Sequence, residues 1–214
     1  LGCTMSPVEA EGLVRSWLAS ERIEIREQED ARAHLHLLVK YPLGKSGHMF
    51  AIIIPKDRDL LAISSMTRVD EGQQNSMKDM MKSDPEDWKS WMHECRMQLI
   101  ASGVDWGIHL GHSDGDRKGP LQAFNVSEPV WFDGLSKNEM MQNLRRLWLA
   151  KLGIIHEIKY TFGAGSGKSG PVDDWQGKAD GKARVGRSNP PQPKEVHTDE
   201  SMSFGEGFDP SDWI

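Results

Sequence analysis

The stretch whose residues most resemble a chemical site is GAGSGKSG, at positions 163–170. Glycine-rich loops that end in Gly-Lys-Ser cradle phosphates, but the pattern also requires a glycine five residues before that triplet, where this chain has Phe162. A phosphate loop also follows a buried strand and opens a helix, whereas here an expected helix precedes it and Gly170-Pro171 follows. The sequence therefore predicts a flexible linker and no nucleotide site.

Histidines and aspartates form two further groups that are candidates for metal ligation. His34 and His36 alternate along an expected strand, so their side chains share one face. The second group lies in and beside a polar loop and contains His109, His112, Asp114 and Asp116. Metal sites need three or four converging ligands, and nothing in the sequence joins the two groups. We therefore expect a solvent-facing strand and a turn. A metal-dependent hydrolase is kept as an alternative, with the ligands His34, His36, His109, His112 and Asp114.

Signatures of nucleophilic catalysis are absent from the sequence. There is no Gly-x-Ser-x-Gly elbow, and neither Cys3 nor Cys95 lies in a nucleophile motif. We therefore expect no catalytic residues, no bound metal and no cofactor. Two cysteines in 214 residues exclude a disulfide framework and favour the cytoplasm. The net charge of −6 disfavours nucleic acid as a partner, and no apolar run approaches the length of a membrane span.

Helix signals mark four places along the chain. Ser6-Pro7 begins a helix that should end near Ser20, a second helix is expected beyond Asp70, and a third begins at Asp84-Pro85 and should end at Gly103. The fourth begins at Ser136, with Glu139 at the capping-box spacing.

Strand signals are alternating or β-branched runs, at residues 23–26, 33–41, 48–55, 60–67, 104–110 and 121–132. Short connections within residues 33–67 permit only antiparallel neighbours. Pro129 should push its strand to an edge or a bulge. The prediction is an α+β domain over residues 1–160, in the order α-β-β-β-β-α-β-β-α. It has a mostly antiparallel sheet of five to six strands and helices on one face.

The last expected helix carries an unusually wide apolar stripe, which includes Trp148 and Ile155. Such a helix either packs between the sheet and a second subunit or covers a groove, so both residues are candidates for partner binding. A homodimer is one expected outcome. Gly153 is unfavourable inside a helix, which leaves open whether residues 154–162 continue the helix or form a strand.

Residues 161–214 have a different composition, with nine glycines and five prolines among 54 residues. Low hydrophobicity predicts a disordered tail. Residues 168–194 carry an excess of cationic side chains, which gives a nucleic-acid adaptor as another alternative, and the chain from Glu195 onward contains six acids and no Lys or Arg. Large apolar residues punctuate these acids and are candidate anchors for a groove: Phe204, Phe208, Trp213 and Ile214. The equally weighted alternative is a solubilising acidic tail.

Four segments of residues 8–160 resemble a known family: HLLVKYP with the glycine turn after it, FAIIIPKDRD, GVDWGIHL and WFDGLSKNEMMQNLRRLW. They are similar to an uncharacterised, mainly archaeal family with the type III secretion chaperone-like fold. The resemblance implies an α+β layer pair, often a homodimer, whose surface holds an extended partner segment. It implies no catalytic residues. The function expected is a non-enzymatic, protein-binding module of chaperone or adaptor type, which holds a protein partner or its own tail.

Overall fold

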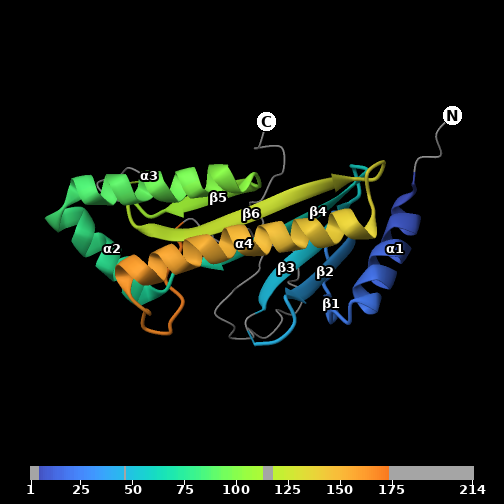
Figure 1. The fold of residues 1–214 in the computed structure, drawn as a ribbon, viewed down its shortest axis with the longest axis horizontal. Coiled ribbons are helices and arrows are strands. Elements are labelled where there is room, and N and C mark those ends of the chain that lie inside the picture. Colours follow the sequence, from blue (N-terminus) through green and yellow to red (C-terminus); the bar gives the residue numbers. More distant parts are fainter. Residues whose placement is uncertain (1–4, 46, 113–117, 174–214) are drawn as a thin grey trace, which may run out of the picture.

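The computed structural model describes residues 5–45, 47–112 and 118–173 (Figure 1). Its elements, in chain order, are α1 (Pro7–Ser20), β1 (Ile25–Glu27), β2 (Ala33–Tyr41), β3 (His48–Pro55), β4 (Leu60–Arg68), α2 (Glu71–Ser83), α3 (Pro85–Ser102), β5 (Asp105–Leu110), β6 (Leu121–Trp131) and α4 (Lys137–Phe162). This is the α+β fold expected from the sequence. No helix in the described ranges is both long enough and apolar enough to span a membrane.

The helices begin and end where local signals predict. The Ser6 hydroxyl accepts from the backbone N–H of Glu9 at 3.3 Å, and the Glu9 carboxylate accepts from the Ser6 backbone at 2.8 Å. Asp84 and Ser136 cap α3 and α4 by accepting from the backbone N–H groups of Asp87 and Glu139. Gly103 ends α3 in the left-handed conformation, with φ 71°, which a glycine adopts without steric penalty.

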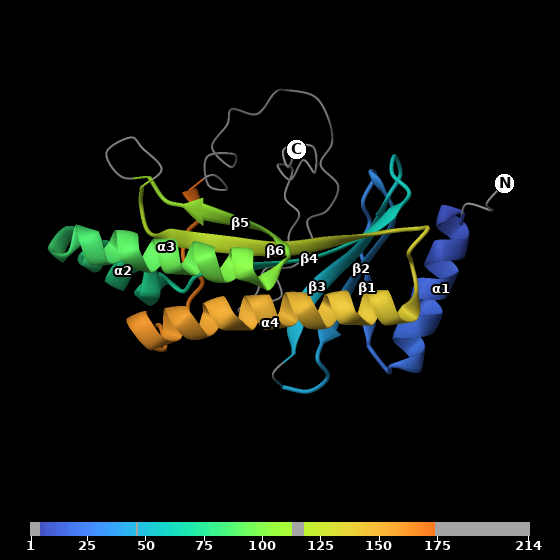
Figure 2. The same cartoon turned by 45° about the horizontal axis from the view of Figure 1, so that its top comes forward.

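All strands pair antiparallel in one six-stranded sheet with the order β1-β2-β3-β4-β6-β5. Strands β1 to β4 form the expected meander. Helices α2, α3 and α4 lie on one side of the sheet, and α3 and α4 run next to each other (Figures 1 and 2). One continuous hydrophobic core fills the space between the helices and the sheet.

Strand β6 explains the position of Pro129. It pairs with β4 along nine residues, but its pairing with β5 stops at Ser127, which faces Asp105. Pro129 faces Ala62 of β4 and has no strand on its other side. Because proline lacks a backbone N–H, it fits at an edge. The edge prediction holds for this end of β6, whereas the first part of the strand lies inside the sheet.

The first strand begins two residues later than predicted. The backbone N–H of Ile23 donates to the carbonyl of Leu18 at 2.9 Å, and the Ile23 side chain is buried. Ile23 therefore closes the end of α1 and does not start β1, whose three residues are exposed.

The question left open at residues 154–162 is decided in favour of a helix, because α4 continues through Gly153 to Phe162. Apart from Asn143, its buried positions recur at spacings of three and four and form a single face: Met140, Leu144, Leu147, Lys151, Ile154 and Ile158. Most of the apolar stripe is therefore covered within the chain itself.

Candidate functional site

The histidine groups lie near opposite edges of the sheet. His34 and His36 are in β2 and His109 is in β5, and the strand order puts three other strands between them. With neighbouring strands about 4.8 Å apart, the two groups are about 19 Å apart and cannot share one ion. In the described ranges no three His, Cys, Asp or Glu side chains are grouped to hold a metal. The candidate residues Asp114 and Asp116 lie outside those ranges.

The histidines of β2 contact acids of neighbouring elements. His34 Nε2 lies 3.3 Å from Glu11 of α1, and His36 Nδ1 lies 3.7 Å from Asp30. Burial lowers the pKa of His36, and the nearby Asp30 charge only partly opposes this. These contacts fasten the first part of β2 to α1 and to the loop before the strand.

The glycine-rich loop 163–170 binds an anion, but the anion is the protein's own Asp70. The backbone N–H groups of Ser166 and Lys168 donate to the two Asp70 carboxylate oxygens at 2.7 and 2.9 Å, and the Ser166 hydroxyl donates at 3.1 Å. Gly165 and Gly167 have φ of 84° and 76°, a conformation that turns successive N–H groups toward one point. The same carboxylate caps α2 through Gly72 at 2.7 Å.

Two glutamines of α2 hold the chain on both sides of this loop. Gln73 Nε2 donates to the carbonyl of Gly163 at 2.7 Å, and Gln74 Nε2 donates to that of Pro171 at 3.0 Å. The Gly170 N–H donates to the Val69 carbonyl at 3.0 Å. The segment predicted to be a flexible linker thus lies against α2 through side-chain and backbone contacts.

Asp173 is the last residue described, and it is fastened to the start of β6. Its carboxylate accepts from the Gln122 side chain at 3.0 Å and from the His112 backbone at 2.9 Å, while its own N–H donates to Gln122 at 2.9 Å. Residues 161–173, assigned above to the tail, therefore lie on the domain. The predicted anchors Phe204, Phe208, Trp213 and Ile214 and most of the basic segment 168–194 lie outside the described residues.

The partner-binding candidates on α4, Trp148 and Ile155, are seven residues apart on one flank of the helix, and Trp148 there contacts Tyr41 of β2. Both are half-buried against the core. The Trp148 ring packs edge-on against Tyr41, with centroids 6.5 Å apart. The Trp148 indole Nε1 is buried and has no hydrogen-bond partner among the described residues. This flank is largely occupied by the chain itself.

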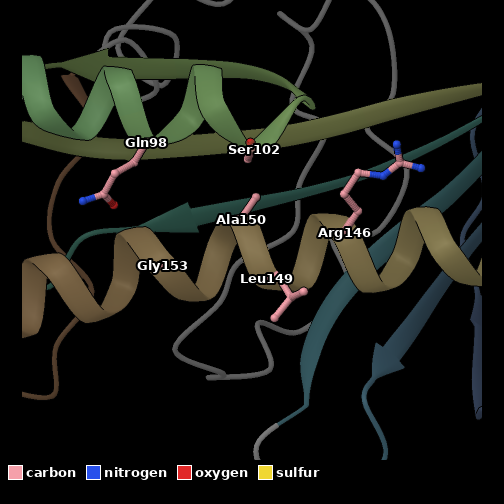
Figure 3. A pocket seen from close by; sticks show the side chains of 6 residues that line it. All are labelled: Gln98, Ser102, Arg146, Leu149, Ala150 and Gly153. Atoms are coloured by element: carbon pink, nitrogen blue, oxygen red, sulfur yellow. The ribbon is translucent and has the colours of Figure 1, made fainter.

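A shallow groove lies on the other flank of α4, against α3 (Figure 3). Its volume is about 280 Å³, and its lining residues are Gln98, Ser102, Arg146, Leu149, Ala150 and Gly153. Leu149 is 45% exposed at its rim. The sequence marked Gly153 only as a possible helix break, and no periodicity pointed to a groove here.

Arg146 supplies the charge at one end of this groove. Its guanidinium lies 3.2 Å from Glu128 of β6 and 3.8 Å from Glu139, and it donates to Asn143 at 2.6 Å. Burial raises the pKa of Glu128, and Arg146 opposes that shift. The cation is therefore largely compensated, and the groove is apolar at its centre.

Sequence reasoning missed a buried cation, Lys151, which is 0% exposed in the middle of the α4–sheet interface. Its ammonium donates to the Ser65 hydroxyl at 2.8 Å and lies 5.8 Å from the centroid of the Phe50 ring. The available signal was its position: it follows Leu147 by four residues and precedes Ile154 by three, which is the spacing of the stripe.

A Ser–Lys pair can act as nucleophile and base, but this one is arranged for packing. The Ser65 hydroxyl donates to the Met49 carbonyl at 2.6 Å, and both side chains are buried. A substrate carbonyl has no route to the Ser65 oxygen in this conformation. Cys95 is equally inaccessible: burial, followed by the charges of Glu157 and Glu94, raises the pKa of its thiol to about 12.

The family described as "Uncharacterized conserved protein (DUF2299)" matches residues 10–158. Among solved structures, the chain is similar to an uncharacterized protein from Methanothermobacter thermautotrophicus, at 27% identity and a TM-score of 0.61. That match covers 72% of this chain and 99% of the other. No match is found among curated proteins. The residues after α4 thus lie beyond the family match.

Proposed function

We propose that this chain, which belongs to the uncharacterized conserved protein family DUF2299, is a non-enzymatic protein-binding module of chaperone or adaptor type. The proposed binding site is the groove between α3 and α4, and the occupant is an apolar side chain presented by a protein partner. The two-cysteine composition supports a cytoplasmic setting.

The observation that carries this proposal is the glycine in the groove. A glycine inside a helix costs about 1 kcal/mol relative to alanine. Helix-interior glycines are usually needed where another element packs closely, but a Cβ added at Gly153 would meet nothing within 4 Å. Packing among the described residues therefore does not require this glycine. Its effect is to leave the groove open.

The size and lining of the groove suit a side chain better than a metabolite. Pockets for small molecules and cofactors usually enclose about 300–1,000 Å³, and this one is shallow and at the low end. Ala150 and Leu149 present apolar surface, while Gln98 and Ser102 offer polar groups from α3 (Figure 3). An apolar anchor seated between such residues is the usual centre of a protein interface.

The resemblance to secretion chaperones is a second line of support, because that fold implies a surface that holds a partner segment. A second copy of the chain is another candidate occupant, since Leu149 and the 89% exposed Tyr160 lie on the outward side of α4. Sedimentation of the full chain distinguishes the two occupants, because only self-association gives a mass that rises with concentration.

The experiment compares full-length variants of Gly153 as baits in a pull-down with chemical crosslinking. Gly153→Leu should fill the groove and reduce recovery of the crosslinked partners at least several-fold. Gly153→Ala should raise the melting temperature, because it removes the helix penalty of about 1 kcal/mol. Val8→Ala is the matched control, because it removes an exposed apolar side chain on α1, outside the groove. Equal recovery with Gly153→Leu and the wild type would reject the groove as the binding site.

A further inference from the structure

The strand register shows which residues lie on the face of the sheet that points away from α3 and α4. One row of paired residues crosses all six strands: Arg26, Leu38, Ala51, Ser64, Ser127 and Asp105. Further rows on this side contain Ile53 with Ala62, Met66 with Asn125, and Arg68 with Ala123. We call this surface the open face, because no described helix lies on it (Figure 2).

The open face has small and apolar side chains at its centre and cationic side chains around them. Its middle strands carry alanines and serines, flanked by Leu38, Ile53 and Met66, none of which is fully exposed. Small central residues let another chain approach the sheet closely. Among the strand residues of this face, three are cationic, Arg26, Lys40 and Arg68, and one is acidic, Asp105. His36 and His109 lie on the same face, and Asp30 lies beside His36.

We propose that the C-terminal segment 195–214 of this chain covers the open face, with its large apolar residues on the apolar centre and its acids against the cations. The segment combines six acids and no Lys or Arg with Phe204, Phe208, Trp213 and Ile214. Its charge is opposite to that of the open face, and aromatic side chains supply most of the affinity in such contacts. The proposal does not depend on the groove.

The attachment point of the segment makes the contact geometrically feasible. Asp173 is held at the start of β6, where the chain after α4 has run past the end of the sheet (Figure 2). Glu195 follows 22 residues later, and a flexible chain of that length spans about 25 Å on average. Six strands are about 24 Å wide. A tether of this length keeps its end at an effective concentration near millimolar, so weak contacts suffice.

Methionine footprinting of the full chain tests the proposal. Met49 and Met66 lie on the open face, and Met97, 48% exposed on α3, is an internal control on the helix side. A full-length variant with Phe204→Ala, Phe208→Ala, Trp213→Ala and Ile214→Ala should oxidise at Met49 and Met66 several-fold faster than the wild type. Oxidation of Met97 should be unchanged. Equal rates at Met49 and Met66 in both proteins would overturn the proposal.

Two further measurements separate this contact from other occupants. Protection by a tethered segment is independent of protein concentration, so protection that disappears on dilution would show a second copy and overturn the proposal. High salt should accelerate oxidation of Met66 in the wild type, because it screens the acid–cation attraction. Gly153→Leu, which fills the groove, should leave both rates unchanged, so this test and the pull-down can fail separately.

Discussion

The carboxylate of Asp70 accepts hydrogen bonds from both the backbone N–H and the hydroxyl of Ser166, 96 residues further along the chain. The same carboxylate caps α2. One side chain therefore holds both the start of this helix and the glycine-rich loop 163–170 that follows α4. The glycine-rich loop has the backbone geometry of an anion site, and this acid fills it. A phosphate group could bind to this loop only by displacing the Asp70 carboxylate.

Substitutions at Asp70 should separate the two roles of its carboxylate. Asp70→Ala removes the cap of α2 together with the hydrogen bonds from Ser166 and Lys168. We expect a loss of about 1–2 kcal/mol in unfolding free energy. Asp70→Asn keeps an oxygen that caps α2, since asparagine caps as well as aspartate, but it loses the second acceptor for the Lys168 N–H. Hydrogen exchange should be faster at Lys168 in both variants, and at Ser166 in Asp70→Ala. Exchange in α2 should rise only in Asp70→Ala.

Acid should release the segment 163–173 before the domain unfolds. Burial opposes ionisation of Asp70, but hydrogen bonds from Ser166, Gly72 and Gln73 outweigh it and lower its pKa. Hydrogen bonds from Gln122 and His112 lower the pKa of Asp173. Their stabilisation is therefore complete above the unfolded pKa of about 3.9 and is lost as pH falls through the lower folded values.

Protease accessibility of residues 163–173, measured from pH 6 downward, checks this expectation. Cleavage should be constant to about pH 4 and then increase. In Asp70→Asn the increase should be smaller, because one of the two titrating groups is gone. An increase between pH 5 and 7 would contradict the assignment to carboxylates.

Lys151 should be more valuable to the specificity of the fold than to its stability. Lys151→Met keeps the length of the side chain and removes a buried charge, so the melting temperature should stay unchanged or rise. Lys151→Ala should lower it, because it leaves a cavity beneath α4. Ser65→Ala removes one acceptor of a buried ammonium and should cost about 1–3 kcal/mol. Thermal unfolding of the three variants gives the order directly.

Cys95 should be unreactive toward thiol reagents while the protein is folded. With a thiol pKa of about 12, about one molecule in ten thousand carries the thiolate at pH 8, and the sulfur is also buried. In a Cys3→Ser background, labelling should appear only when denaturant unfolds the domain. Stoichiometric labelling of the native protein within minutes would show that the α3–sheet interface opens readily.

Local signals predicted the elements because their causes are local. Ser136 with Glu139, and Asp84 with Pro85, act within one helical turn. Four consecutive residues are therefore enough to predict the start of each helix. The partner of the glycine-rich loop could not be predicted, because glycines indicate that an anion can bind but do not identify it. Lys151 was overlooked for a different reason: its spacing matched the stripe, but its charge excluded it from an apolar pattern. The groove at Gly153 depends on how α3 and α4 meet, which no single segment encodes.

The strand order has a consequence for how the chain reaches this structure. Strands β1 to β4 pair through short connections. Strand β4 also pairs with β6, from which α2, α3 and β5 separate it in the sequence. The contact between Arg68 and Ala123 closes a loop of 55 residues, about three doublings of a hairpin turn, which adds about 2 kcal/mol of closure entropy. Non-local pairing of this kind slows folding. The β4–β6 ladder is thus the non-local pairing that joins the N-terminal meander to the rest of the sheet.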